Sequence, residues 1–270
     1  MPYDKKNKWI KPNSFVCDDF HNAMLNIRPN SIDCIFTSPP YNVGKKYDSS
    51  DDNKKYKQYL DFLNDAWKLA RKVLKPDGRL IINVPSITYE GYYQPLYVDI
   101  INQCRKLNYV MRSDIVWYKQ AMSKRTAWGS WMSPSSPYVI QPYEFILVFQ
   151  KDKNNYKHKG KKENIDITKD EFITFSDGFW NIKAETLLSK IHPAPFPFDL
   201  AYRILKFYTY KHDTVLDMFG GTGTVALACS KIERNFIYID ISKKYCNFAK
   251  RRVKDGIVLG SSIFKRGKKC

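Results

Sequence analysis

Short apolar runs rich in β-branched residues alternate with longer segments of helical period along this chain of 270 residues. Such alternation is typical of βα units around a mostly parallel sheet. The predicted strands are 13–17, 31–36, 78–84, 109–118, 143–149, 213–218 and 235–240, and the predicted helices are 56–74, 93–106, 197–209, 222–232 and 242–253. We expect an α/β fold with a mainly parallel sheet and one antiparallel strand near 143–149. The first helix is expected to end at Lys75-Pro76-Asp77-Gly78, which reads as a helix stop and a turn.

The alternation fails between about 119 and 180, where Trp128-Gly129-Ser130-Trp131 is followed by KDKNNYKHKGKKEN. This composition indicates a polar, basic, loop-rich insertion at one edge of the sheet, although a disordered surface excursion has the same composition.

The net charge is +18, which needs an anionic partner or serves solubility, and 43% apolar residues are enough for a core. The six cysteines form no CxxC pair and the four histidines no HExxH motif, so we expect reduced core thiols and no metal. No run has the length of a membrane helix and the first residues have no signal-peptide core, which predicts a cytoplasmic protein.

The sharpest local signal is Thr37-Ser38-Pro39-Pro40-Tyr41-Asn42, directly after an apolar strand. Two prolines fix two φ angles and remove two N–H donors, so this loop presents acceptors. The Ser38 side chain and the Pro39 carbonyl can each accept one hydrogen of a planar amino group, which makes its nitrogen lone pair available for attack. Tyr41 can stack on a base removed from its duplex. The alternative is a strand-ending Pro-Pro turn with an incidental tyrosine.

The second signal is Val215-Leu216-Asp217-Met218-Phe219-Gly220-Gly221-Thr222-Gly223-Thr224, followed by a helix and a strand that ends at Asp240. Glycines let backbone approach a ligand, the helix N-terminus offers N–H groups to a carboxylate, and Asp240 can take ribose hydroxyls. The spacing is not the G-x-G-x-x-G of dinucleotide enzymes. A nucleoside cofactor with an ammonium, which Asp217 can face, and a carboxylate fits better; the alternative is a plain tight turn.

Together the two motifs resemble the catalytic and cofactor motifs of the amino-group DNA methyltransferases, which use S-adenosylmethionine to methylate cytosine N4 or adenine N6. The catalytic motif comes first, which is similar to the beta group found among type II restriction-modification methyltransferases. Phe15-Val16-Cys17-Asp18 resembles the strand whose Asp contacts the cofactor's adenine, with Cys17 in place of the usual Gly. Ile115–Lys119 resembles a late sheet strand, and His192–Pro197 resembles the segment that covers the methionine end.

The resemblance implies a Rossmann-like methyltransferase fold with a circularly permuted motif order. It implies a catalytic half at 1–118, a target-recognition insertion at 119–180 and a cofactor-binding half at 181–270 of one domain. The implied catalytic residues are Ser38, Pro39, Pro40 and Tyr41. The implied S-adenosylmethionine-binding residues are Asp18, Thr37, Phe196, Asp217, Phe219, Gly221, Gly223, Thr224 and Asp240.

The implied reaction is direct transfer to a base flipped out of double-stranded DNA. Ser38 favours cytosine N4, because the family often has Ser there for cytosine and Asp or Asn for adenine N6, which stays the alternative. RNA or protein amide methylation, or a DNA-binding module with a vestigial cofactor site, are the more distant alternatives. A cognate restriction endonuclease, and a monomer or homodimer, are further expectations.

The expected DNA contacts are Lys45, Lys46, Lys124, Arg125, Trp128 and Ser130. Lys157, Lys159, Lys161 and Lys162 are expected to add to these cations, while a solvated lysine-rich loop is the alternative. Trp131 fits either this patch or the core.

Overall fold

The computed structural model describes residues 9–42, 54–86, 88–89, 93–120 and 129–263. The strands are β1 (Ser14–Cys17), β2 (Ile32–Thr37), β3 (Leu74–Pro85), β4 (Thr88–Tyr89), β5 (Tyr93–Gln94), β6 (Val110–Tyr118), β7 (Tyr143–Gln150), β8 (Phe179–Asn181), β9 (Thr214–Asp217) and β10 (Asn235–Asp240). The helices are α1 (Phe20–Leu25), α2 (Tyr56–Val73), α3 (Leu96–Lys106), α4 (Lys169–Phe175), α5 (Phe198–Tyr208), α6 (Thr224–Lys231) and α7 (Lys243–Asp255), with a 3-10 turn η1 (Lys162–Asn164).

Eight strands form one sheet in the order β1-β10-β9-β2-β3-β7-β6-β8. Strand β7 is antiparallel to both of its neighbours, and every other pairing in this sheet is parallel. The expected mainly parallel sheet with one antiparallel strand near 143–149 is confirmed. A hairpin of β4 and β5 stands outside the sheet.

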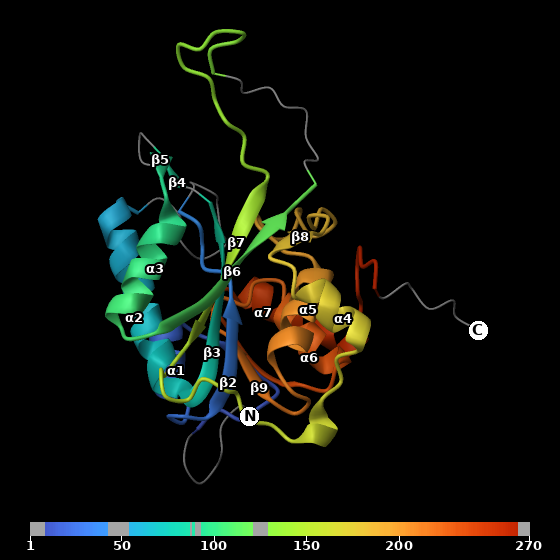
Figure 1. Ribbon diagram of the computed structural model, residues 1–270. Helices are drawn as coiled ribbons and strands as arrows, with labels where there is room; N and C mark the ends of the chain where they lie inside the picture. Colours follow the sequence, from blue (N-terminus) through green and yellow to red (C-terminus); the bar gives the residue numbers. More distant parts are fainter. Residues whose placement is uncertain (1–8, 43–53, 87, 90–92, 121–128, 264–270) are drawn as a thin grey trace, which may run out of the picture.

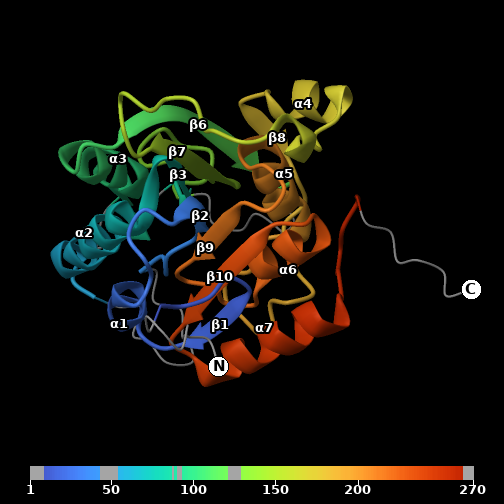
Figure 2. The same ribbon diagram turned by 90° about the horizontal axis from the view of Figure 1, so that it is seen from below.

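Helices cover both faces of the sheet, α1 to α3 on one and α4 to α7 on the other (Figure 1; Figure 2 gives the perpendicular view). The alternating side chains of each strand divide the core accordingly. Ile35 of β2 packs with the α2 residues Leu63 and Trp67, whereas its neighbour Phe36 packs with the apolar residues of α5 and α6. The described residues include no helix that is long and apolar enough to cross a membrane.

Strand β3 begins earlier than expected. It follows α2 directly at Leu74, so the segment 75–78 is part of a strand and not a free turn. Leu74 pairs with Ile32, and the register between β2 and β3 shifts before the next pair, Cys34 with Arg79. The extra residues are therefore taken up as an irregularity within the ladder.

The segment 119–180 is divided between the two ends of the sheet. Strand β7 lies inside the sheet between β3 and β6, α4 packs on α5, and β8 forms the sheet's last strand. Residues 129–142 project from the end at which β2 and β3 finish (Figure 1). Because β7 runs in the opposite direction, the residues after it, 151–168, lie at the other end.

Candidate active site

The carboxyl ends of β1, β2, β9 and β10 surround a pocket at one edge of the sheet. β9 and β2 are neighbours, but α6 and α2, which follow them, lie on opposite faces, which is the place where α/β proteins hold ligands. The pocket contains about 760 Å³, including space open to solvent. Its lining residues are Asp18, Asp19, Phe20, Ser38, Pro39, Pro40, Tyr41, Phe62, His192, Ala194, Met218, Phe219, Asp240, Ile241, Ser242 and Tyr245.

The motif after β2 is fixed from both sides. Thr37 is fully buried and its Oγ1 donates to Asp217 Oδ1 at 2.8 Å. The Pro40 carbonyl accepts a hydrogen bond from the Tyr59 hydroxyl at 2.7 Å. Asn42, in the left-handed region at φ +54°, uses its side-chain amide to bind both backbone groups of Lys54. The motif is therefore held rigid at the pocket wall.

A buried polar network lies behind Ser38 and Tyr41. The Tyr41 hydroxyl lies 2.8 Å from Ser38 Oγ and donates to Glu144 Oε2 at 2.9 Å. Asn83 Nδ2 donates to Glu144 Oε2 at 2.6 Å and to the Tyr41 hydroxyl at 2.9 Å. The Lys119 ammonium forms an ion pair with Glu144 Oε1. The hydroxyl of Tyr41 is thus anchored inside the protein, while the residue still lines the pocket.

Asp217 lies behind the pocket wall. Its side chain is almost fully buried and accepts from Thr37 and, at 3.2 Å, from the Phe219 amide. Burial raises the pKa of this carboxyl to about 7, and the two hydrogen bonds oppose that shift. The pocket lining described here includes its neighbours Met218 and Phe219 but not Asp217.

The glycine turn after β9 has the backbone shape that its sequence predicts. Gly221 and Gly223 have φ of +48° and +74°, and a Cβ on Gly223 would lie 2.6 Å from Ala249 Cβ. The amides of the three glycines in the turn all donate within the protein. The Gly220 and Gly223 amides donate to backbone carbonyls, and the Gly221 amide donates to Asp240 Oδ2 at 2.8 Å. These hydrogen bonds build the turn and are not directed at a ligand.

Asp240 joins the turn to the loop after β10. Its other oxygen accepts from the Ser242 amide at 2.8 Å, so the carboxylate is held by backbone at both ends. Thr224, also expected near a ligand, is 2% exposed and accepts from Arg252 Nη1 at 2.9 Å. Phe196 packs on Phe36, with ring centroids 5.4 Å apart, and lies outside the described lining.

Of the expected DNA-binding residues, only Ser130 lies within the described part of the chain. Its hydroxyl donates to the Ser133 carbonyl and accepts from the Ser136 amide, so it shapes the turn of the projecting segment. Lys45, Lys46, Lys124, Arg125 and Trp128 lie outside the described residues. Trp131 is 66% exposed, which excludes the core for it.

The expectation that the lysines at 157–162 join a cluster beside the pocket is wrong. They follow β7, and the Lys159 amide binds Asp77 at the start of β3, at the edge opposite the pocket. The expectation that all cysteines are core thiols is also wrong for Cys17, which is exposed, whereas the thiols of Cys34, Cys104, Cys229 and Cys246 are buried. Cys270 lies outside the described residues.

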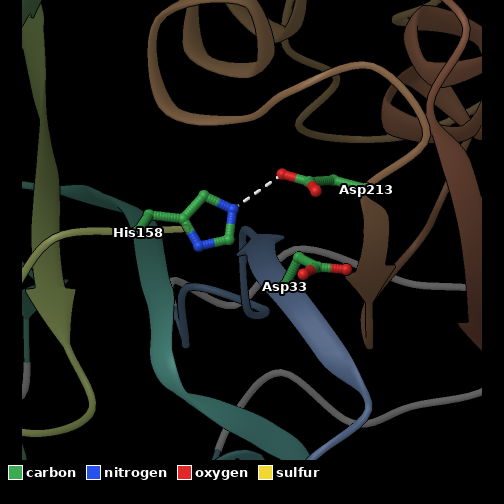
Figure 3. Close-up of side chains that lie close together, drawn as sticks. All are labelled: Asp33, His158 and Asp213. Carbon is green, nitrogen blue, oxygen red and sulfur yellow. Dashed lines mark hydrogen bonds and ion pairs between the residues drawn. The ribbon is translucent and has the colours of Figure 1, made fainter. Parts of the chain in front are cut away.

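Figure 3 shows a second polar cluster, Asp33, His158 and Asp213, at the amino ends of β2 and β9. His158 Nε2 lies 2.8 Å from Asp213 Oδ2, and Nδ1 lies 3.3 Å from Asp77. Asp33 already binds the Lys75 ammonium with one oxygen and the Thr214 amide with the other. These contacts tie the chain after β7 to the amino ends of the neighbouring strands, and His158 Nδ1 makes no hydrogen bond among the described residues.

Sequence reasoning missed Asn83, Lys119 and Glu144, although two of them leave a signal. Asn83 and Glu144 are single polar residues inside the apolar strand sequences LIINV and YEFILVF. A polar side chain that interrupts a buried strand needs a partner, so such an interruption predicts a buried polar contact. It does not say which residue across the sheet supplies that contact.

Comparisons with known proteins agree with this geometry. The type II methyltransferase M.MjaVI of Methanocaldococcus jannaschii is 44% identical over 181 residues, which are 66% of this chain and 90% of that protein. The DNA adenine methyltransferase YhdJ of Escherichia coli is 28% identical over 85% of this chain and 79% of its own length. A DNA modification methylase of Thermus thermophilus, solved with S-adenosyl-L-methionine, superposes with a TM-score of 0.72 at 26% identity, over 92% of this chain and 95% of that one.

A family model described as DNA methylase matches residues 32–251. The match includes the motif after β2, the glycine turn and Asp240, and it covers all of the pocket lining except Asp18, Asp19 and Phe20. The chain therefore belongs to the S-adenosylmethionine-dependent DNA methyltransferases that methylate adenine N6 or cytosine N4.

Proposed function

We propose that this protein methylates the exocyclic N4 amino group of cytosine in double-stranded DNA, after the base is flipped into the pocket. The observation that carries the proposal is Ser38, whose hydroxyl lies at the pocket wall where the family's first catalytic position falls. A hydroxyl is a weaker acceptor than a carboxylate, and the amino group of cytosine needs orientation more than deprotonation.

S-adenosylmethionine supplies an activated methyl group bound to a positively charged sulfur. The pocket fits such a cofactor, because its lining combines acidic side chains with aromatic rings. Asp18 is assigned to the adenine and Asp240 to the ribose hydroxyls. Each carboxylate oxygen of Asp240 accepts one backbone amide, which fixes the side chain at the pocket wall.

The other residues that we assign to the cofactor pocket contribute by shaping it. Phe219 contributes a ring to the pocket, while Thr37, Gly221, Gly223 and Thr224 shape the backbone around it. Phe196 supports the motif strand from behind through Phe36. Asp217 acts electrostatically from beneath the pocket, where an ammonium nearby would favour its ionised form.

The protein's part in the reaction is orientation. Ser38 Oγ and the Pro39 carbonyl accept the two amino hydrogens, and the Tyr41 ring stacks on the base while its hydroxyl stays anchored. The amino nitrogen would so be held in line with the methyl group that S-adenosylmethionine supplies; the thioether S-adenosylhomocysteine would leave, and one amino proton would be released. Positioning of this kind supplies a large part of the acceleration in such reactions.

DNA binding is assigned to the pocket's edge of the sheet. The segment 129–142 projects there, and the whole chain carries a charge of +18. We propose that the part of 119–180 at this edge recognises the target site, and that the protein acts with a cognate restriction endonuclease as a monomer or homodimer. The segment 151–168, at the far edge, is left out of this assignment.

Adenine N6 is the second candidate, and it is favoured by one finding, the similarity to a DNA adenine methyltransferase. The two candidates differ in the size of the base that Ser38 and Tyr41 must hold.

One experiment separates the candidates. The purified protein is incubated with S-adenosylmethionine and unmethylated genomic DNA, and the DNA is digested to nucleosides for mass spectrometry. We expect N4-methylcytosine. N6-methyladenine as the product would overturn the assignment to cytosine. A Ser38→Ala variant is the control: if methylation is lost in this variant, the product of the wild type was formed in this pocket.

A further inference from the structure

Glu144 is a buried carboxylate directly behind the catalytic motif. Its side chain is 6% exposed, and it comes from β7, which crosses the sheet against the direction of β2 and β3. Lys119, at the end of β6, neutralises one of its oxygens. Tyr41 and Asn83 donate to the other oxygen. The charged and titratable groups that face Glu144 among the described residues are thus Lys119 and Tyr41.

The charge on Glu144 decides the direction of every hydrogen bond in front of it. An ionised carboxylate only accepts, so the single hydroxyl hydrogen of Tyr41 points at Glu144. In the 2.8 Å contact between Tyr41 and Ser38, the tyrosine hydroxyl then cannot donate to Ser38. The Ser38 hydrogen points to Tyr41 or to the Asn83 carbonyl, 3.1 Å away. Both alternatives direct the Ser38 hydrogen into the protein, so toward a group in the pocket Ser38 can act only as an acceptor.

Asn83 supports the same direction. Its amide points Nδ2 at Glu144 and Tyr41, while its fully buried Oδ1 has no hydrogen-bond partner among the described residues. A buried amide oxygen without a partner costs free energy, so this orientation indicates a strong acceptor at position 144.

We propose that Glu144 is a positioning residue that acts through Tyr41 to make Ser38 an obligate hydrogen-bond acceptor. A protonated carboxyl would donate to Tyr41, Tyr41 could donate to Ser38, and the serine hydrogen could turn toward the pocket. An ionised Glu144 thereby selects a base that presents an amino group, a donor, over one that presents a carbonyl. The inference rests on the proposed contact between Ser38 and an amino group, and it holds for cytosine and for adenine.

The first test compares Glu144→Gln with the wild type in single-turnover methyl transfer to DNA. We expect the rate constant to fall about 10- to 100-fold, because glutamine has the same shape but can donate to Tyr41. The dissociation constants for S-adenosylmethionine and DNA should stay within about twofold, which corresponds to about 0.4 kcal/mol. Glu163→Gln, at an exposed position, is the matched control. A wild-type rate for Glu144→Gln overturns the proposal.

A double-mutant cycle tests the route through Tyr41. Tyr41→Phe removes the hydroxyl and keeps the ring, so Glu144→Gln should add little to its effect. Effects that multiply would overturn the proposed route.

Rescue by a conservative variant separates orientation from simple structural support. Lys119→Met removes the cation that pairs with Glu144 Oε1, so the methyl-transfer rate constant should fall while the dissociation constants for S-adenosylmethionine and DNA stay within about twofold. Lys119→Arg, which keeps the positive charge, should restore most of the rate, and Lys68→Met, at an exposed helix position, should leave it unchanged. A wild-type rate for Lys119→Met would overturn the proposal, and this variant also serves if Glu144→Gln does not fold. The methylated nucleoside is identified in the same reactions. Failure of the cytosine assignment is then seen independently of the rate constants of the variants.

Discussion

The two edges of the sheet each hold a buried polar cluster, but the clusters differ in how their hydrogen-bonding capacity is used. At the amino edge, Asp33 has one oxygen on Lys75 and the other on a backbone amide, and Asp213 accepts from His158 and from the Tyr210 amide. At the carboxyl edge, Ser38 and Tyr41 belong to a network and also line a pocket.

This difference indicates a structural role for the cluster at the amino edge and a role in ligand binding for the cluster at the carboxyl edge. The cluster at the amino edge fastens chain segments and is not part of the pocket lining, so it should contribute stability. A cluster with acceptors directed at a pocket is held by its own partners, and its value is the orientation of a ligand. Variants at the two edges should therefore change different measurements.

The largest expected effect concerns Asp217, a buried carboxyl with no cation among the groups that shift its pKa. Its pKa rises from 3.8 to about 7 in the folded protein, so its protonated form favours folding. The stabilisation is complete below pH 3.8 and is lost as pH rises to about 7, a change of about 4 kcal/mol. Asp217→Asn should remove this dependence.

Denaturant unfolding without cofactor from pH 4 to pH 8 measures the effect. The free energy of unfolding of Asp217→Asn minus that of the wild type should increase with pH up to about pH 7 and stay constant above it. Curves parallel throughout would show that the carboxyl titrates normally in the folded protein.

Ser38→Ala should lower the methyl-transfer rate about 100-fold, because one amino hydrogen loses its acceptor at the pocket. Cofactor affinity and the thermal unfolding midpoint should change little, since the residue is only partly buried. Rapid-quench methyl transfer and calorimetry check both statements. A rate near that of the wild type would place the amino-group acceptor elsewhere.

His158→Gln should lower the free energy of unfolding by about 2 kcal/mol, since it disturbs a buried group between Asp77 and Asp213. The methyl-transfer rate per folded molecule should not change. Denaturant unfolding and single-turnover rates, measured on one preparation, provide the comparison. A loss of rate without a loss of stability would break the division between the two edges.

The smallest effect is expected for Tyr59→Phe, which removes the hydrogen bond to the Pro40 carbonyl. One neutral hydrogen bond contributes about 1 kcal/mol, so the rate should fall a few-fold with the ring packing kept. Steady-state kinetics can resolve this change. A drop as large as that of Ser38→Ala would make Tyr59 a main determinant of the loop's position.

Much of the fold follows from periodicity, and its failures have physical reasons. The strand 235–240 matches β10 to the residue, because an apolar run bounded by polar residues has clear ends. Helices α1 and α4 are too short for a periodic signal. Strand β8 has three residues, and the buried Trp180 within it gives no pattern. Residues 93–95 looked helical, but β5 and Pro95 precede α3 there.

The motifs of the site could be predicted from the sequence, but the residues that hold these motifs in place could not. Ser38 and Tyr41 belong to one local sequence, whereas Glu144 reaches them only through the packing of a distant strand. The misplaced lysines at 157–162 show a different error. An antiparallel strand was expected at 143–149, and the direction of that strand already sends the chain that follows it to the far edge of the sheet.

The strands that come first and last in the sequence, β1 and β10, are neighbours in the sheet, so the pocket can form only when both have been synthesised. Ser14 of β1 pairs with Ile237 of β10, and of the acidic residues that flank the pocket, Asp18 follows β1 and Asp240 ends β10. The catalytic loop leaves the ribosome early, but its pocket lacks a wall until residue 240 is available. A nascent chain that stops earlier has the loop without the pocket, so methylation can begin only after β10 and Asp240 have been translated.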